Sequence, residues 1–200
     1  MSQQTLEHYW QDRMFEEGYF TYPNLYSSAV RTFGDRSVFV EVGCWKGRSA
    51  AFMAVEIINS KKNIRFDCVD PWEEIQDGQN VGNIYEKFIS NTKRVSHVIN
   101  AIRKTSVEAA ADHADESVDF VFIDGHHGYD SVVADINAWL PKMKIGGFLT
   151  GHDYGWCSDV RRAVHDTLGE GTGKHTDQYG VRYDSYSDPW NEGCWMVHIQ

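Results

Sequence analysis

The sequence predicts an α/β protein built in three layers, with helices covering both faces of a mostly parallel sheet. Short runs rich in β-branched and aromatic residues alternate with longer segments whose apolar residues recur at helical spacing. Several of these runs end in a glycine or an acidic residue, as strands do where a parallel sheet opens onto a ligand site. The 200 residues contain no internal repeat and no linker, which favours a single domain.

The first such unit is a strand, a glycine turn and a helix in direct succession. Residues 38–41 are predicted to form a buried strand, Gly43 and Gly47 open a turn, and a helical pattern begins after Arg48. Glycine allows positive φ and lets the backbone approach a ligand closely. This arrangement therefore suits a nucleotide-like ligand at the mouth of a parallel sheet.

The spacing of this turn narrows the kind of ligand. It is Gly-x-x-x-Gly with Trp45 at its centre, and it differs from the Gly-x-Gly-x-x-Gly of dinucleotide binders. Glu41, two residues before the first glycine, is compatible with a ligand that carries a cationic amine and incompatible with a pyrophosphate. The alternative interpretation is an ordinary glycine turn of an α/β protein.

A second strand, at residues 64–69, ends in Asp70 before Pro71. Asp70 follows Gly43 by 70 − 43 = 27 residues, a little beyond the roughly 20 typical of the acid that binds ribose hydroxyls in a βαβ unit. A carboxylate can accept both ribose O–H donors. We interpret Asp70 as that acid, and a strand-ending turn residue is the alternative.

Further elements complete the alternation. The remaining strands are predicted at residues 98–103, 118–123, 148–150, 177–184 and 194–199. Gly146-Gly147 is predicted to turn into the strand at 148–150, and residues 73–82 are predicted to form a surface loop. The remaining helices are predicted at residues 83–94, 107–114 and 129–140, and in a last segment that ends at Gly169.

Residues 1–33 are predicted to form an N-terminal helical extension, followed by the main domain at 34–200. Leu6, Tyr9, Trp10, Met14 and Phe15 keep helical spacing, and Pro23 starts a second helix. Such an extension could cover the ligand site, cap the sheet edge or pair with a second subunit in a homo-oligomer.

Two acids and three histidines follow the fourth and fifth strands. Asp124 is followed by His126 and His127, and Asp153 is preceded by His152. Two ionised carboxylates at neighbouring strand ends repel each other, and a divalent cation such as Mg²⁺, Mn²⁺ or Ca²⁺ removes that repulsion. Coordination by His152 would favour Mn²⁺ or Fe²⁺. The alternative is that these residues belong to turns and helix caps.

These patterns together resemble class I S-adenosylmethionine-dependent methyltransferases. The first motif of that class is matched by an acid and two glycines around an aromatic residue: Glu41-x-Gly43-x-Trp45-x-Gly47. Two later motifs resemble a bacterial group related to the macrocin and cephalosporin-gene-cluster enzymes. They are Asp124-Gly-x-His127-x-Tyr129 and, after Gly-Gly, His152-Asp153-Tyr154. The resemblance implies a Rossmann-like sandwich with a seven-stranded sheet, mostly parallel with an antiparallel last strand.

The resemblance also implies a site. S-adenosylmethionine would be bound by Glu41, Gly43, Trp45, Gly47, Ser49, Asp70, Ser106 and Asp124. Ser106 is the position that would contact adenine, and its alternative role is the N-cap of the next helix. His127 would be the general base beside Asp124, with His126 as the second candidate. Asp124, His152 and Asp153 would hold Mg²⁺ or Mn²⁺, although His152-Asp153 departs from the pair usual in metal-dependent members and leaves the third ligand open.

Composition limits the partners. The net charge of −10 and the pI near 5.3 disfavour nucleic acid and anionic membrane surfaces, which need a basic footprint. The N-terminus lacks the apolar core of a signal peptide, no run is long enough to span a membrane, and the four cysteines form no Cys-x-x-Cys pair. These features predict a cytoplasmic protein.

We therefore predict a methyltransferase that acts on a hydroxyl of a small molecule. One alternative is a non-catalytic S-adenosylmethionine-binding or scaffold protein, which would not need His127. Another is a metal-dependent hydrolase that uses Asp124, His126, His127 and Asp153. A nicotinamide-dependent oxidoreductase is a third, and it would need the glycine fingerprint that this chain lacks.

Overall fold

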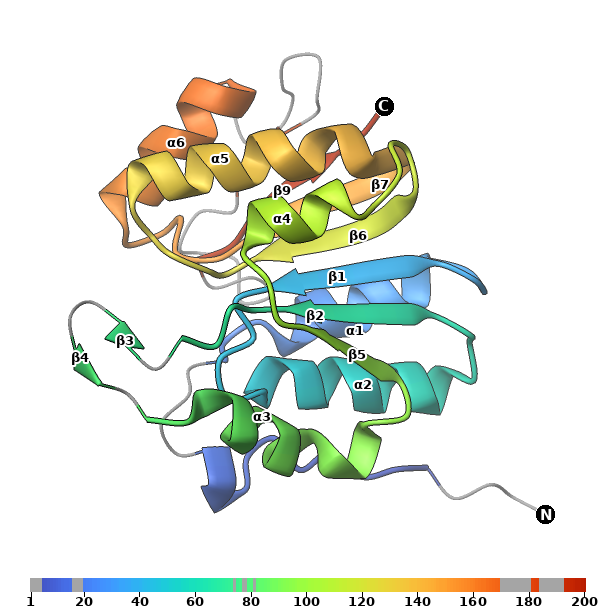
Figure 1. Ribbon diagram of the computed structural model, residues 1–200. Helices are drawn as coiled ribbons and strands as arrows, with labels where there is room; N and C mark the ends of the chain where they lie inside the picture. The colour runs from blue at the N-terminus through green and yellow to red at the C-terminus, as the bar shows by residue number, and fades with distance from the viewer. Residues whose placement is uncertain are drawn as a thin grey trace.

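The predicted three-layer α/β/α sandwich is confirmed (Figure 1). The structure is a computed structural model that describes residues 5–15, 20–73, 75–76, 79–80, 82–169, 181–183 and 193–200. Its central sheet has the strand order β5-β2-β1-β6-β7-β9-β8. The strands are β1 (Val38–Val42), β2 (Arg65–Val69), β5 (Ile99–Ile102), β6 (Val118–Ile123), β7 (Met143–Gly151), β8 (Val181–Tyr183) and β9 (Trp195–His198).

The pairing of these strands explains where the site lies. Strands β5, β2, β1, β6 and β7 are parallel, β9 runs antiparallel to β7, and the short β8 pairs antiparallel with β9 at the edge. The chain runs outward from β1 to β5 and then returns to β6 on the other side of β1. Ligands in such sheets bind at the carboxyl ends of the strands, at this switch point.

Among the described residues, six α-helices cover the two faces of the sheet (Figure 1). One face carries α1 (Pro23–Thr32), α2 (Arg48–Ser60) and α3 (Ile84–Thr92), and the other carries α4 (Ser106–Ala111), α5 (Tyr129–Trp139) and α6 (Ser158–Leu168). Short 3₁₀ turns lie at Arg13–Phe15, Lys93–Val95 and Leu140–Lys142. The strand side chains alternate between two apolar clusters because successive residues of a strand point to opposite faces.

The predicted start of the fifth strand is wrong. Strand β7 begins at Met143, five residues before the predicted start at 148, so Gly146-Gly147 lies inside the strand. Gly146 has φ +82°, and the register with β6 shifts between Val118 and Phe120. The glycine pair therefore forms an irregularity within the strand, where an unpaired residue with positive φ is tolerated.

The predicted helix over Leu6–Phe15 is also wrong. Only Arg13–Phe15 forms a helical turn, of 3₁₀ type. Leu6 instead exchanges two backbone hydrogen bonds with the Asn59 side chain, at 2.8 and 3.0 Å. The buried Tyr9 and Phe15 pack on α2, so tertiary contacts override the local periodicity. The second predicted helix is confirmed as α1, and residues 1–4 and 16–19 lie outside the described residues.

The predicted loop at 73–82 contains a small hairpin. Strands β3 (Ile75–Gln76) and β4 (Gln79–Asn80) pair antiparallel and project beyond the carboxyl ends of the sheet strands (Figure 1). Of the predicted strand at 177–184, the described part is β8. In the part of the chain that the structure describes, no helix has the length and apolar character to cross a bilayer.

Candidate active site

The glycine turn after β1 is held by close backbone contacts. Gly43 has φ +88°, and a Cβ there would lie 2.0 Å from the carbonyl oxygen of Asp124. Gly47 has φ +84° and is the N-cap of α2, and a Cβ there would meet the side chains of Phe88 and Thr92. Both positions therefore require glycine, and the half-buried Trp45 lies between them with φ 46°.

Glu41 lies beneath this turn, inside the protein. Its side chain is 1% exposed, and the Ser49 hydroxyl donates to its Oε1 atom. Its Oε2 atom and the Tyr26 hydroxyl are the two buried side-chain polar atoms without a hydrogen-bond partner among the described residues. Burial raises the pKa of Glu41 to about 8. From the sequence, Glu41 is compatible with a cationic amine, and its burial favours the neutral form of the carboxyl while no cation is nearby.

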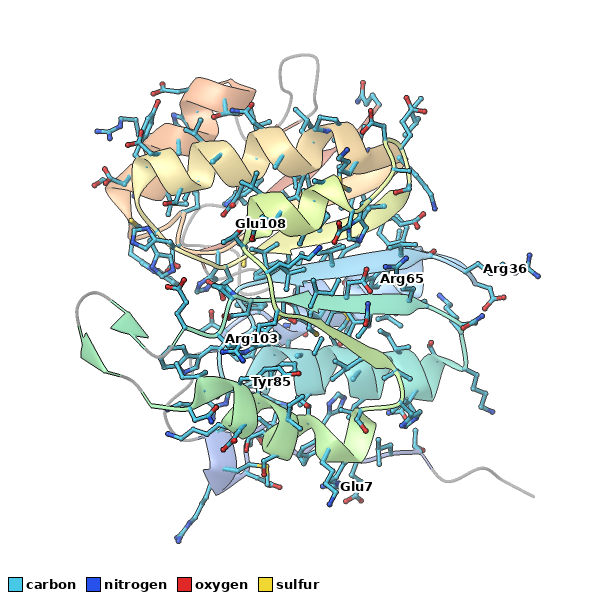
Figure 2. The ribbon with its side chains drawn as sticks, in the orientation of Figure 1. Glu7, Arg36, Arg65, Tyr85, Arg103 and Glu108 are labelled. Carbon is cyan, nitrogen blue, oxygen red and sulfur yellow. The ribbon has the colours of Figure 1, made fainter. Side chains whose placement is uncertain are left out.

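Asp70 ties two turns together at the end of β2. Its Oδ2 accepts the Trp45 backbone N–H at 2.9 Å, and its Oδ1 accepts the Trp72 N–H at 2.7 Å. Burial raises the pKa of this carboxyl. Arg103 donates to the Pro71 and Trp72 carbonyls and stacks over Tyr85, which lies beside it in Figure 2. Asp70 thus makes the contacts expected of a strand-ending turn residue. Its carboxylate also keeps further lone pairs that can accept the hydroxyl donors of a ribose.

Ser106 begins α4 but is not its N-cap. The N-cap is Thr105, which forms a capping box with Glu108, so the alternative role predicted for Ser106 is wrong. The Ser106 hydroxyl accepts the Trp139 Nε1–H at 3.0 Å and hydrogen-bonds to Asp135, whose pKa burial raises to about 6. A signal for Asp135 was available in the sequence, because it is an acid on the apolar face of a predicted helix.

The structure brings the predicted metal ligands together. Asp124 follows β6, and His152 and Asp153 follow the end of the neighbouring β7. His152 Nδ1 lies 3.6 Å from Asp124 Oδ1 and 3.4 Å from Asp153 Oδ1. One ligand atom from each of the three residues lies within 4.8 Å of the others. Asp153 adopts φ 61°, a conformation that is uncommon for a non-glycine residue.

His127 lies at the open side of this cluster. Its Nε2 is 2.6 Å from Asp153 Oδ2 and 3.8 Å from Asp124 Oδ1, and its side chain is 55% exposed. Hydrogen bonding to Asp124 and Asp153 raises the pKa of His127 to about 10. Burial raises the pKa of Asp153, but hydrogen bonds from His127 and His152 hold it well below its usual range. His126 is exposed, and its Nδ1 accepts the Gly128 N–H.

The glycine turn and the acid–histidine cluster form one region. The Asp124 N–H donates to the Val42 carbonyl at 2.8 Å, and the Gly43 N–H donates to the Val69 carbonyl at 2.9 Å. These two hydrogen bonds extend the backbone pairing of β1 with β2 and with β6 past the carboxyl ends of the strands. The predicted residues at the strand ends therefore lie along one edge of the sheet.

Two contacts in this region come from residues that the sequence did not single out. The Tyr22 hydroxyl donates to Asp124 Oδ2 at 2.8 Å, and Thr21 Oγ1 lies 3.0 Å from His152 Nε2. Both residues precede α1 and are more than one hundred positions away from their partners. No local pattern in the sequence reports contacts of that separation.

The fold and this edge define a class of protein. A parallel α/β sheet with a glycine turn after its first strand and acids at the following strand ends is the arrangement of class I S-adenosylmethionine-dependent methyltransferases. The chain belongs to the methyltransferase-domain family, whose model matches residues 40–154. The closer resemblance to the macrocin and cephalosporin-cluster group stays a prediction.

Sequence relatives are distant. The chain is 24% identical over 166 residues to protein R132 of Acanthamoeba polyphaga mimivirus, a match that covers 81% of this chain and 73% of the relative. It is 33% identical over 87 residues to protein y4gI of Sinorhizobium fredii (strain NBRC 101917 / NGR234), which covers 43% of this chain and 10% of the relative. Neither relative adds information about the acceptor.

Solved structures share the fold at low identity. Cofactor-bound Rv0187 from MTB has a TM-score of 0.65 at 15% identity, covering 88% of this chain and 78% of that one. CalS11, a TDP-rhamnose 3′-O-methyltransferase, has a TM-score of 0.61 at 16% identity, and the match covers 87% of this chain and 75% of CalS11. SMU.1697c of Streptococcus mutans, in complex with SAH, has a TM-score of 0.60 at 13% identity, and the match covers 90% of this chain and 97% of SMU.1697c. At these identities the likeness concerns the fold.

Proposed function

We propose that this chain transfers the methyl group of S-adenosylmethionine to a hydroxyl oxygen of a small molecule. The observation that carries the proposal is the shared sheet edge, where the glycine turn of a methyltransferase domain lies beside His127, Asp124 and Asp153. Cofactor and acceptor bound along that edge would meet at the carboxyl ends of β1 and β6. The order in which the chain adds strands to the sheet reverses between these two strands.

The residues fit the cofactor. Oε2 of Glu41 is a buried acceptor below the turn, and a cationic amine placed near it would favour the ionised form of this carboxyl. Gly43 and Gly47 keep the turn clear of side chains. We assign the methionine end of the cofactor to this turn with Trp45 and Ser49, the ribose to Asp70, and the adenine to the side of Ser106.

The residues also fit a divalent cation. Two ligand atoms bound at right angles to one ion at about 2.1 Å lie about 3 Å apart, close to the 3.4 and 3.6 Å observed around His152 Nδ1. The donors are two carboxylates and one imidazole, a set that Mn²⁺ accepts readily and Mg²⁺ less so. We propose that Asp124, His152 and Asp153 hold this ion. When bound, the ion lowers the pKa of a coordinated hydroxyl and offsets the carboxylate charge that keeps His127 protonated.

The chemistry of the step assigns a role to His127. The acceptor oxygen forms a bond to the methyl carbon, the S–C bond breaks, and its electron pair stays on sulfur, which becomes neutral. The hydroxyl proton passes to His127 Nδ1, because Nε2 is the ring nitrogen that contacts Asp153. Asp153 orients the imidazole by its 2.6 Å contact and stabilises the imidazolium that forms.

The test is calorimetric titration of the purified chain with S-adenosylmethionine and with its demethylated product, before and after chelation of metals. Micromolar binding of both ligands is expected. Formation of the demethylated product is then followed with catechols and sugars as acceptors, with and without added Mn²⁺ or Mg²⁺. Failure to bind either cofactor form under any condition would remove the methyltransferase assignment.

A further inference from the structure

The segment Phe20–Tyr22, here named the N-terminal strap, lies across the acid–histidine cluster. Thr21 Oγ1 is 3.0 Å from His152 Nε2, and the Tyr22 hydroxyl donates to Asp124 Oδ2 at 2.8 Å. Two consecutive residues of the strap therefore contact two of the three proposed metal ligands. In each case the contacted atom, His152 Nε2 or Asp124 Oδ2, is not the one that faces the rest of the cluster.

The strap is held in place by aromatic packing. Phe20 packs against Phe52 with ring centroids 5.1 Å apart, and it meets the Tyr22 ring edge-on at 4.8 Å. The buried Tyr22 ring lies 4.3 Å from Phe122 of β6 and 4.9 Å from His152. These contacts set the position of the Thr21 and Tyr22 hydroxyls independently of any bound ligand.

The Thr21 hydroxyl can accept a hydrogen bond from His152 Nε2–H as well as donate one to a bare Nε2, and the first arrangement is the one that suits a metal ligand. A neutral imidazole has one N–H donor and one acceptor nitrogen. If Nε2–H donates to Thr21 Oγ1, the lone pair of Nδ1 points toward Asp124 and Asp153, which is the arrangement that a metal ligand requires. In the opposite tautomer, Nδ1 would carry a proton and could not coordinate.

The contact with Tyr22 selects the oxygen that Asp124 presents. The Tyr22 hydroxyl holds Oδ2, and the remaining Oδ1 is the atom that faces His152 and His127. The carboxylate is thereby fixed in rotation about its χ2 angle. An acid that is free to rotate would lose entropy when it binds an ion.

We propose that Thr21 and Tyr22 are positioning residues of the metal site, in which Thr21 sets the tautomer of His152 and Tyr22 sets the orientation of Asp124. This inference rests on the metal-binding part of the proposed function. Outer contacts of this kind typically change metal affinity about 10–100-fold. It also assigns a role to the segment before α1 that lies outside the matched family region.

The test measures Mn²⁺ binding to the full chain, by calorimetry and by the electron paramagnetic resonance signal of free Mn²⁺. Thr21→Val removes the hydroxyl at nearly constant volume, and Thr21→Ser retains it. Tyr22→Phe removes the second hydroxyl. Tyr9→Phe is the matched control, because Tyr9 is a buried N-terminal tyrosine whose hydroxyl donates to the Asn91 carbonyl instead.

Thr21→Val and Tyr22→Phe are expected to weaken Mn²⁺ binding about 10–100-fold. Thr21→Ser and Tyr9→Phe should stay within about twofold of the wild type, and all four variants should bind S-adenosylmethionine normally in chelator. Unchanged or tighter Mn²⁺ binding in Thr21→Val and Tyr22→Phe overturns the inference. A wild-type chain that binds S-adenosylmethionine but no Mn²⁺ also overturns it, and it leaves the methyltransferase assignment standing. Absence of cofactor binding in the wild type removes that assignment separately.

Discussion

His127 Nε2 lies 2.6 Å from Asp153 Oδ2, so the candidate base and the acid of the next strand end form a direct pair. The two residues follow different strands, β6 and β7, and meet because these strands are parallel neighbours. The pair resembles the base-and-orienter arrangement by which enzymes fix a catalytic imidazole.

Replacement of His127 by alanine is expected to lower the turnover number about 10²–10⁴-fold, the usual contribution of a general base. Binding of S-adenosylmethionine should stay unchanged, because His127 is an exposed residue outside the glycine turn. The measurement is single-turnover kinetics beside calorimetry. His126→Ala is the matched control and should retain activity, and full activity of His127→Ala would remove the base assignment.

Asp70→Ala is expected to weaken binding of S-adenosylmethionine and its product at least about tenfold. The variant loses the proposed ribose acceptor and also frees the Trp45 and Trp72 N–H groups that the carboxylate holds. Calorimetric titration measures both ligands. Glu73→Gln, at an exposed acid three residues later, should bind like the wild type. Equal affinities for Asp70→Ala and the wild type would contradict the role.

Gly43→Ala is expected to destabilise the fold by about 2 kcal/mol or more, since a left-handed conformation costs a non-glycine residue about 1–2 kcal/mol. The added Cβ would also clash with the Asp124 carbonyl, 2.0 Å away, and displace the end of β6. Gly34→Ala is the control, because a Cβ there meets nothing within 4 Å. Urea unfolding of both variants measures the difference, and similar midpoints would refute the expectation.

Glu41→Gln is expected to gain stability with rising pH relative to the wild type. Burial raises the pKa of Glu41 from 4.5 to about 8, so the folded state keeps a proton that the unfolded state releases. Wild-type stability therefore falls between about pH 4.5 and 8, and the variant does not share this loss because an amide does not titrate in this range. The same variant should bind S-adenosylmethionine more weakly. Unfolding at pH 5 and pH 8 tests the first point, and a pH-independent difference would contradict it.

A buried ion pair on the other face of the sheet gives a second pH effect. Asp67, which is 0% exposed, accepts from His113 Nε2 at 2.9 Å and pairs with Arg65 at 2.8 Å. Arg65 is labelled in Figure 2. The Asp67 contact raises the pKa of His113, and hydrogen bonds from His113 and Arg65 lower the pKa of Asp67 although burial opposes this.

The raised pKa of His113 means that its contribution is complete below its ordinary value of 6.5 and is lost at higher pH. The lowered pKa of Asp67 means that its contribution is present above 3.8 and is lost in acid. Asp67→Asn should therefore lower the free energy of unfolding most between about pH 4 and 6.5, by on the order of 3 kcal/mol. Urea unfolding at pH 5.5 and 8.5 measures this, and a larger loss at pH 8.5 would refute the sign.

Local patterns in the sequence were sufficient to predict the order of the strands of the central sheet and of helices α1 to α6, and the residues at the strand ends. The carboxyl ends of parallel strands must share one edge, so the sequence by itself was enough to expect Asp124 and Asp153 close together. The errors arose where packing overrides periodicity, as at Leu6–Phe15, where the backbone bonds to Asn59 instead of forming a helix.

Packing of the whole chain was needed to place the groups that lack a local pattern. The pKa of Glu41 is raised because the protein buries it, and Thr21 and Tyr22 reach the site because aromatic contacts hold the strap there. Sequence periodicity reports which face of an element is apolar. It carries no information on which distant hydroxyl meets a given carboxylate, because that contact follows from the packing of the whole core.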